Sequence, residues 1–247
     1  MNILLLGYGK MGKTIEKIAL ERDHQVAGRI DADNHADLAN LEPDDVDVVI
    51  EFSSPESAAE NITYCLERGW PIVCGTTGWL SHRNEIEALC RDRKGAFFYA
   101  SNYSIGVNLF FRLNKVLAKF MRKYPSYQVS MTEIHHTEKK DAPSGTAITL
   151  AEGVMEHLPT KHRWIGKEGN VPLINSTDAV EIESLREGTV PGTHTVRYDS
   201  DVDRIEITHV AHSRQGFALG AVVAAEWLVG REGVFSMDDL LGMINYE

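Results

Sequence analysis

The 247-residue chain carries 36 acidic side chains against 25 lysines and arginines, which gives a formal net charge of −11 at pH 7. Its hydrophobic fraction of 43% and charged fraction of 25% are those of an ordinary soluble globular protein. A chain of this length folds as one large domain or as two modest ones. The acidic balance argues against nucleic acid as a partner, because binding a phosphate backbone needs a concentrated positive face.

Neither the cysteines nor the apolar runs indicate export or a membrane function. An odd number of cysteines without metal-ligand spacing cannot complete a disulfide framework, so we expect reduced thiols in a cytoplasmic protein. They are Cys65, Cys74 and Cys90. The chain turns at Gly7 after an apolar run too short for a signal peptide. The longest mostly apolar run, Phe217–Val229, contains a glutamate and is too short to span a membrane.

The first hundred residues alternate between short apolar runs and segments of helical length. The runs are continuous in their apolar character, which indicates strands buried on both faces, as in a parallel sheet covered by helices. Right-handed crossovers then produce a doubly wound α/β sheet. We predict strands at Ile3–Leu6, Val26–Ile30, Val46–Phe52, Ile72–Cys74 and Ala96–Ala100.

A glycine-rich loop follows the first predicted strand and opens a helix. The residues Gly7-Tyr8-Gly9-Lys10-Met11-Gly12 match the G-x-G-x-x-G pattern of Rossmann-type dinucleotide-binding folds. There the first glycine makes the tight turn, the second lets the backbone approach a pyrophosphate, and the third permits close helix–strand packing. With Lys13 and Thr14 the same stretch also matches a P-loop. In that interpretation the strand Val48–Glu51, which ends in an acid, would hold magnesium. The loop alone leaves both interpretations open.

Asp31 favours the dinucleotide interpretation. It ends the second predicted strand 19 residues after Gly12, where a dinucleotide site needs a carboxylate for the adenosine ribose hydroxyls. A carboxylate also repels a 2′-phosphate, and Ala32 follows with no lysine or arginine immediately beyond. We therefore predict that NADH is used at least as well as NADPH.

The pattern changes in the second half of the chain. A helix is predicted from Val107 to Lys123, and the strands that follow alternate apolar and polar residues, so each buries one face. They are predicted at Tyr127–His135, Ala179–Arg186, Thr193–Asp199 and Arg204–Ala211, the last two joined by a hairpin. This half is therefore α+β with a mixed, largely antiparallel open sheet. The apolar helix Phe217–Val229 is expected to pack on the first sheet, which predicts one domain of residues 1–103 with 217–247 and another of 104–216.

Two histidines and two lysines lie between a predicted strand end and the start of an apolar helix. The stretch from Glu133 to Ala147 reads EIHHTEKKDAPSGTA, and Ser144 or a neighbour can cap the helix. The first amides of that helix, at Gly145 and Thr146, are then free to bind a carboxylate. Imidazole suits proton transfer near neutral pH, and lysine suits carboxylate binding or proton donation. The alternative is one buried histidine, one exposed histidine and solvated lysines. A metal site is not predicted, because neighbouring side chains on a strand point to opposite faces.

The segment His135-His136-x-x-Lys139-x-Asp141-Ala-Pro-Ser-Gly-Thr146 resembles the signature of the dihydrodipicolinate reductase family. The resemblance spans nearly the whole chain in the family's order. It extends to Gly75-Thr76-Thr77-Gly78, to Ala100-Ser101-Asn102-Tyr103-Ser104-x-Gly106-Val107-Asn108 and to Glu206-Ile207-Thr208-His209-x-Ala211-x-Ser213-Arg214. The chain departs from the family at Ala32, where a basic residue often follows the ribose-binding acid.

The resemblance implies a role for each matched position. His135 would donate or accept a proton, Lys139 would donate one, and His136, Gly145 and Thr146 would hold a substrate carboxylate. The implied cofactor-binding residues are Gly7 to Gly12, Asp31, Gly75, Thr76, Thr77, Ala100, Ser101, Asn102 and Tyr103. The family's fold and a homotetramer assembled through the second domain are implied as well.

The implied activity is the NAD(P)H-dependent reduction of a cyclic imine dicarboxylate to tetrahydrodipicolinate in the diaminopimelate route to lysine. Hydride goes to the conjugated ring at C4 with loss of the 4-hydroxyl, and an enamine-like species is then protonated. Three alternatives remain open at this point: another two-domain NAD(P)-dependent dehydrogenase, a non-catalytic NADH sensor and a P-loop nucleotidase.

Overall fold

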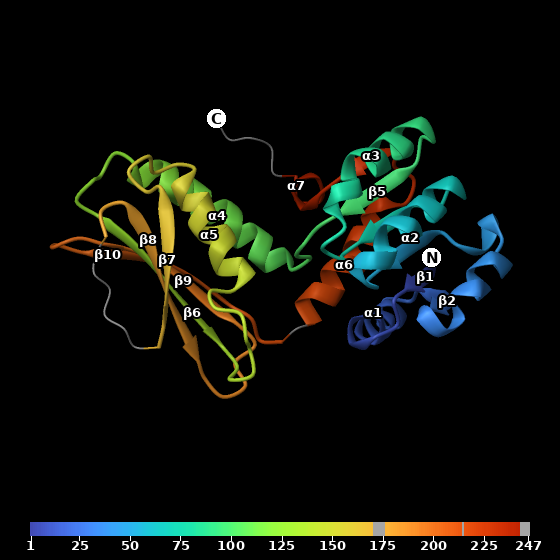
Figure 1. Ribbon diagram of the computed structural model, residues 1–247, viewed down its shortest axis with the longest axis horizontal. Coiled ribbons are helices and arrows are strands. Elements are labelled where there is room, and N and C mark those ends of the chain that lie inside the picture. Colours follow the sequence, from blue (N-terminus) through green and yellow to red (C-terminus); the bar gives the residue numbers. More distant parts are fainter. Residues whose placement is uncertain (170–175, 214, 243–247) are drawn as a thin grey trace. The chain divides into compact units, whose positions relative to one another are not determined.

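The computed structural model describes residues 1–169, 176–213 and 215–242 (Figure 1). The chain divides into two compact units, the first made of residues 1–105 and 215–247 and the second of residues 106–214. Arg214, which belongs to one of the quoted family segments, lies outside the described residues. Among the helices that are described, none has the length and apolar character needed to cross a membrane.

The first unit is built on a six-stranded sheet in the order β11-β5-β4-β3-β1-β2, and every pairing in it is parallel. All five predicted strands are present, which confirms the doubly wound α/β class. The sixth, β11, was not predicted, because a three-residue edge strand leaves little pattern. The strands are β1 (Asn2–Leu6), β2 (Gln25–Ile30), β3 (Val48–Glu51), β4 (Ile72–Cys74), β5 (Ala96–Tyr99) and β11 (Gly233–Phe235).

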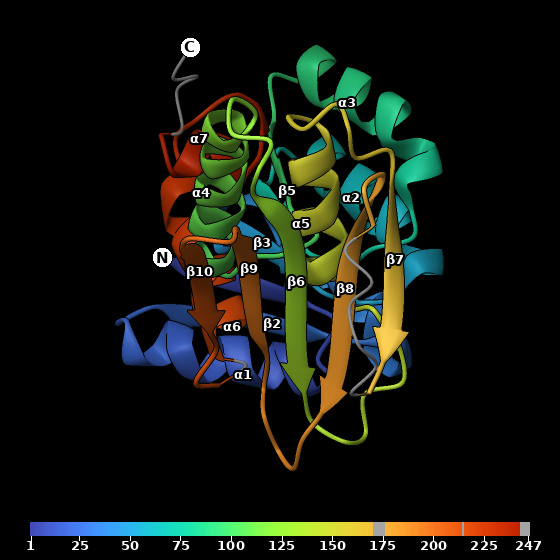
Figure 2. The ribbon, with the colours of Figure 1, turned by 90° about the vertical axis from the view of Figure 1, so that its left-hand side faces the viewer.

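Helices cover both faces of this sheet (Figures 1 and 2). On one face α1 (Lys10–Glu21) and α6 (Gln215–Leu228) pack against a core that includes Ile3, Leu5 and Ile50. On the other face α2 (Pro55–Glu67) and α3 (Arg83–Asp92) pack against a second core. The apolar helix near the C-terminus therefore packs on the first sheet, as predicted. Shorter helices are η1 (Ala32–Asn40), η2 (Pro43–Asp45), η3 (Leu80–His82) and α7 (Met237–Leu240).

The second unit has a five-stranded sheet in the order β10-β9-β6-β8-β7. The mixed character is confirmed, but parallel pairings are as numerous as antiparallel ones, because the unpredicted edge strand β7 pairs in parallel with β8. Residues 199 and 204 pair across the predicted hairpin between β9 and β10. The strands are β6 (Gln128–His135), β7 (Arg163–Glu168), β8 (Ala179–Arg186), β9 (Thr193–Asp199) and β10 (Arg204–Val210).

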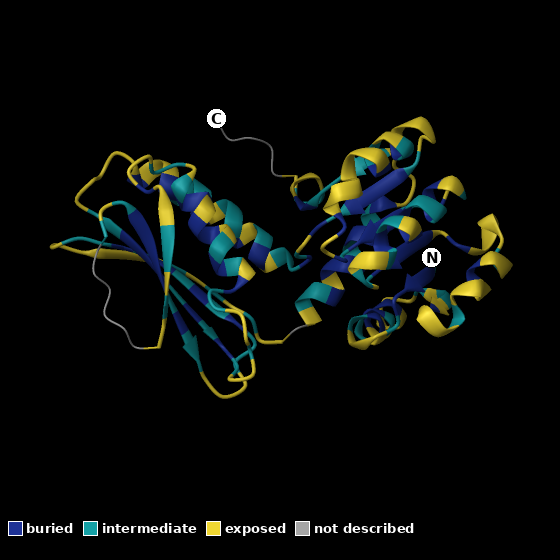
Figure 3. Ribbon diagram, in the orientation of Figure 1, coloured by how far each residue is buried: buried dark blue, intermediate teal, exposed yellow. Residues whose placement is uncertain are grey.

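Two helices, α4 (Ile105–Met121) and α5 (Gly145–Met155), lie on one face of the second sheet (Figure 2). Their apolar side chains form the core of this unit with those of the facing strands. The edge strand β10 is mostly exposed, whereas the inner strands of the first sheet are buried (Figure 3). The described helices of the second unit thus leave the opposite face of its sheet to solvent or to a partner.

Candidate active site

The glycine loop has the backbone geometry that its sequence pattern predicts. Gly7 has φ +89°, and a Cβ there would lie 2.1 Å from the carbonyl oxygen of Phe52. A Cβ on Gly12 would lie 2.3 Å from the carbonyl oxygen of Gly7, so this glycine permits close packing of α1 on the loop. A Cβ on Gly9 would meet nothing within 4 Å among the described residues. Gly9 therefore borders open space at the N-terminus of α1, where an anion is stabilised.

A groove of about 540 Å³ lies beside this loop. Asp31 caps η1, its carboxylate accepting from the amide of Ala32 at 3.0 Å, and it lines the groove. Arg29, the nearest basic residue on β2, donates through Nε to Glu16 Oε1 at 2.8 Å, so its charge is already paired. The groove is also lined by Gly7, Gly9, His35, Phe52, Ser53, Ser54, Ser57, Glu60 and Asn61. Open backbone at Gly9 and a carboxylate at the end of β2 fit a dinucleotide.

The P-loop interpretation finds no support in the same loop. Lys13 is exposed on α1, and the Thr14 hydroxyl donates to the Lys10 carbonyl at 2.9 Å, an ordinary contact of the first helical turns. Glu51, the acid of the proposed magnesium strand, is fully buried and accepts the Cys74 thiol at 3.1 Å. These side chains have structural partners within the first unit.

The other predicted cofactor residues lie at the carboxyl ends of β4 and β5, outside the lining of this groove. Thr76 is buried, and its hydroxyl accepts the Ser53 amide at 2.9 Å. Tyr103 is buried and donates to the Cys74 carbonyl at 2.7 Å. A Cβ on Gly75 would overlap the Phe52 ring. These residues therefore shape the strand ends, and Thr77 and Ser101 are exposed beside them.

In the second unit, the helix-facing side chains of β6 change from apolar to polar along the strand. Because side chains alternate between faces, Val129, Met131, Glu133 and His135 point the same way. Val129 and Met131 belong to the core under α4 and α5. Glu133 and His135 continue this surface and are also buried. A buried carboxylate and a buried imidazole thus stand at the end of an otherwise apolar row.

Glu133 lies opposite His194 of β9 and Ser184 of β8 in the strand register. It is fully buried, and its Oε1 accepts the Ser144 amide at 3.0 Å and an Arg186 Nη2–H at 3.4 Å. Burial alone would raise the pKa of this carboxyl, but the interactions with His194, Ser144 and Ser184 outweigh it and lower the pKa to about 2. Glu133 is therefore ionised at neutral pH.

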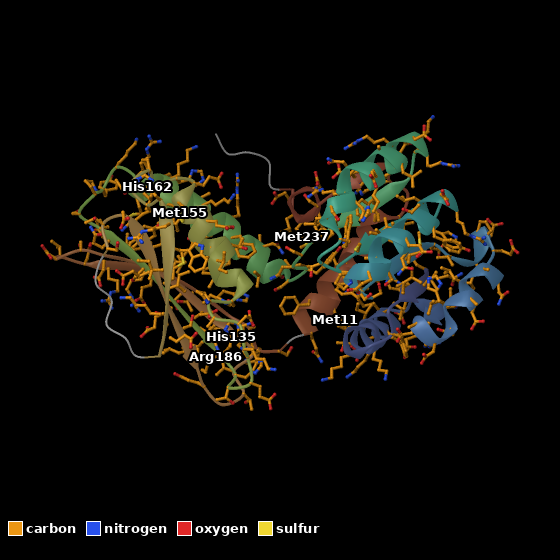
Figure 4. The ribbon with its side chains drawn as sticks, viewed as in Figure 1. Met11, His135, Met155, His162, Arg186 and Met237 are labelled. Carbon is orange, nitrogen blue, oxygen red and sulfur yellow. The ribbon has the colours of Figure 1, made fainter. Side chains whose placement is uncertain are left out.

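His135 ends β6 beside this carboxylate. Its Nδ1 lies 3.4 Å from Glu133 Oε2, and its ring centroid lies 5.0 Å from that of His194. Figure 4 shows His135 next to Arg186, its register partner on β8. Burial lowers the pKa of His135 to about 4, although the negative charge of Glu133 acts in the opposite direction. The imidazole is therefore neutral in the free protein at neutral pH.

The loop after β6 is tied down by two basic side chains. Lys139 donates through Nζ to both carboxylate oxygens of Asp141 at 2.7 Å, and this contact lowers the pKa of Asp141. Arg186 donates to the carbonyl oxygens of Asp141 at 2.7 Å and Lys139 at 3.3 Å. The predicted proton donor is thus held by a carboxylate two residues further along the chain.

The N-terminus of α5 is fixed against the same cluster. Ser144 caps the helix, its hydroxyl accepting the Ala147 amide at 3.2 Å and lying 3.1 Å from His194 Nε2. This confirms the predicted cap. A Cβ on Gly145 would meet nothing within 4 Å in the described part of the chain, so the first turn of α5 is open. Thr146 is partly exposed beside it.

His136 lies on the other side of the strand end. It is partly exposed and lines a separate pocket of about 370 Å³. The remaining lining residues come from the loop after β6 and from the β8–β9 connection. They are Thr137, Glu138, Gly188, Thr189 and Pro191.

Glu133, His135 and His194 have the composition of a metal site, since one ligand atom from each lies within 4.8 Å of the others. In the structure, however, His194 Nε2 already has the Ser144 hydroxyl as a partner at 3.1 Å. Glu133 and His194 are thus joined through Ser144 in a buried hydrogen-bonding network, whereas His135 lies beside it without a hydrogen bond to Glu133. That this site binds no metal stays a prediction.

Two protein-family models match the chain, one in each half. The model described as the N-terminus of dihydrodipicolinate reductase matches residues 1–103, and the model for its C-terminus matches residues 106–241. The chain belongs to the dihydrodipicolinate reductase family. A curated 4-hydroxy-tetrahydrodipicolinate reductase from Christiangramia forsetii is 50% identical over 98% of each chain. One from Methanosarcina mazei is 36% identical and covers 98% of this chain and 100% of its own.

Solved structures agree on the fold. A dihydrodipicolinate reductase from a Paenisporosarcina species, solved with dipicolinate bound, has a TM-score of 0.77 and 21% identity, covering 97% of this chain and 99% of its own. Membership of the dihydrodipicolinate reductase family makes the chain an NAD(P)H-dependent oxidoreductase. The P-loop nucleotidase and the non-catalytic sensor are therefore set aside.

Proposed function

We propose that this chain catalyses the reduction of 4-hydroxy-tetrahydrodipicolinate to tetrahydrodipicolinate in the diaminopimelate route to lysine. The observation that supports this most strongly is the cluster in the second unit. The ionised Glu133 lies beside His135 and accepts an amide at the open N-terminus of α5, and the charge of Lys139 acts on His135. A dicarboxylate needs fixed donors, and a reduced ring needs a proton. The cluster offers both in an otherwise acidic protein.

The reaction consumes one hydride and one proton and releases water and the oxidised cofactor. The nicotinamide, when bound, supplies the hydride to the conjugated ring of the substrate. The groove with Gly9 and Asp31 would hold the dinucleotide, which assigns residues 1–103 and 217–247 to the cofactor. Residues 104–216 would bind the substrate, so the reaction needs both units of the chain.

In the second unit the α5 amides of Gly145 and Thr146 would bind one carboxylate, aided by the positive end of the helix dipole. Lys139 and His136 would hold the other carboxylate or the ring. His135 would carry the proton that the reduced ring requires, since a positioned imidazole typically contributes about 10²–10⁴-fold to turnover.

The test is a spectrophotometric assay of NADH oxidation with substrate freshly generated by condensation of aspartate semialdehyde and pyruvate. Oxidation that depends on both precursors supports the proposal. Oxidation of NADH with other imines or aldehydes, and none with this substrate, would favour the alternative of another two-domain dehydrogenase.

His135→Gln is expected to lower kcat by roughly 10²–10⁴-fold, about 2.7–5.5 kcal/mol of barrier, with little effect on NADH binding. Lys139→Ala is expected to lower turnover by a comparable or larger factor, because substrate binding and proton delivery are both affected. Steady-state kinetics with cofactor titrations check both variants. Turnover within about threefold of wild type in both would remove these residues from the mechanism.

We further propose that NADH serves at least as well as NADPH. The carboxylate of Asp31 lines the groove, and Arg29, which lies two residues before it on β2, is paired with Glu16. A 2′-phosphate would therefore meet a negative charge without an available counter-charge. An affinity for NADPH more than about tenfold above that for NADH at physiological salt would contradict this assignment.

A homotetramer in the cytoplasm completes the proposal. The described helices of the second unit cover one face of its sheet, and the opposite face carries the partly exposed pair Thr195–Thr208 and the pair Arg197–Glu206. Such a face is suited to pairing with another copy. Sedimentation equilibrium should give four times the 27.6 kDa chain mass, and a monomer at micromolar concentration would refute the assembly.

A further inference from the structure

We propose that Glu133 is a positioning residue that holds the proton of neutral His135 on Nδ1 and so presents Nε2 to the substrate. This inference rests on the function proposed above and assigns a role to a side chain that the signature segment does not include. It starts from two buried atoms that face each other.

Glu133 Oε2 and His135 Nδ1 are both buried, and neither has a hydrogen-bond partner within the described residues. They lie 3.4 Å apart. Because a carboxylate can only accept, a hydrogen bond between them must use a proton on Nδ1. A shift of roughly half an ångström would close the contact to normal length, as occurs when catalytic hydrogen bonds tighten in a complex.

The other oxygen of Glu133 is already committed. Oε1 accepts the Ser144 amide at 3.0 Å and Arg186 at 3.4 Å, so two donors on two different elements fix the carboxylate. The carboxylate therefore connects the cap of α5 with His135. Gly192 leaves room on the opposite edge of the ring, since a Cβ there would lie 3.1 Å from His135 Nε2.

The charges around His135 come from four elements. Glu133 lies on its own strand, His194 on β9, Arg186 on β8 and Lys139 in the following loop. Of these groups, only the carboxylate favours the protonated imidazole, whereas the other three disfavour it. Glu133 is thus also the group that keeps protonation of His135 accessible during turnover.

Glu133→Gln tests the inference without a change of shape. A glutamine would place its oxygen where the Ser144 amide and Arg186 donate, so its NH₂ group would face His135 and require a bare Nδ1. The proton would then move to Nε2. In a serine protease triad, a substitution that leaves the geometry intact but gives the wrong histidine tautomer lowers kcat by about 10⁴-fold. We expect kcat to fall by roughly 10²–10⁴-fold in Glu133→Gln.

The deciding measurement is the ¹⁵N NMR spectrum of histidine-labelled protein without substrate or cofactor, with His135 assigned by its loss in His135→Gln. The wild type is expected to show Nδ1–H and Glu133→Gln to show Nε2–H. Glu152→Gln, at an exposed position of α5, is the matched control and should keep the wild-type tautomer and kcat within about twofold.

An Nε2–H tautomer in the wild type, or an unchanged tautomer in Glu133→Gln, would overturn the inference. If Glu133→Gln does not fold, the wild-type spectrum alone decides. A wild type with Nδ1–H that reduces no dihydrodipicolinate would refute the proposed function and leave the positioning role standing. The alkaline limb of the kcat profile should also move to lower pH in Glu133→Gln, because the protonated imidazole loses its stabilising charge, which a purely structural role would not cause.

Discussion

Binding of a dicarboxylate is expected to place a proton on His135. Burial lowers the pKa of this imidazole to about 4 in the free protein, so only about one molecule in 10³ carries the charged form at neutral pH. One substrate carboxylate roughly 5 Å from the ring stabilises that form by roughly 3 kcal/mol at an effective dielectric constant of about 20, a factor of about 10². The sign is fixed: binding raises the pKa, so protons are taken up and affinity increases as the pH falls.

Isothermal titration calorimetry with dipicolinate in two buffers of different ionisation enthalpy measures this uptake. We expect about half a proton per site at about pH 6, and almost none at about pH 8. His135→Gln removes the titrating group and should abolish most of the uptake at the lower pH. If the wild type and His135→Gln take up the same amount within about 0.1 proton, the imidazole is not the group that binding charges, and its low pKa has no part in the reaction.

Three further outcomes are expected. Asp31→Ala should lower the affinity for NADH by about tenfold and the affinity for NADPH less or not at all, as measured by fluorescence titration. Equal losses of affinity for both cofactors would show that Asp31 does not recognise the ribose. Gly9→Ala should leave the melting temperature unchanged and lower the affinity for NADH by at least about tenfold. In Gly12→Ala the new Cβ would press on the Gly7 carbonyl, so the free energy of unfolding in urea should fall by more than about 2 kcal/mol. Dialysis against EDTA should leave turnover within about twofold, and a loss restored by zinc would assign a metal to the buried cluster around Glu133.

The fold was largely predictable where burial leaves a strong pattern. The four inner strands of the first sheet, β1, β3, β4 and β5, are mostly continuous apolar runs, and the helix over residues 215–228 is apolar on nearly all sides. The unpredicted strands β7 and β11 are both edge strands. An edge strand buries little, so β7 (RWIGKE) keeps lysine, glutamate and glycine, and its pattern is that of a loop.

The candidate site was predictable only in part. The signature segment identified His135, Lys139 and the cap at Ser144, because these residues are close in sequence. Glu133 was missed as a functional residue, since a glutamate within a strand is usually exposed, and its contact with His194 depends on a register across strands some 60 residues apart. The sequence does contain one indication of this role. Glu133 lies two and four residues after Met131 and Val129 on the same strand, so the alternation of side chains places it on the buried face.

The order in which the chain is made bears on the first unit, whose helix α6 comes from residues 215–228 and packs on strands from the first hundred residues. During synthesis α1 can cover part of that side of the sheet early, but the part under α6 stays uncovered until the entire second unit has left the ribosome. The intervening unit can fold first, because its residues are contiguous, and the first unit can be completed only afterwards. Truncation before residue 215 should therefore yield an aggregating chain in which part of the apolar face of the first sheet is exposed.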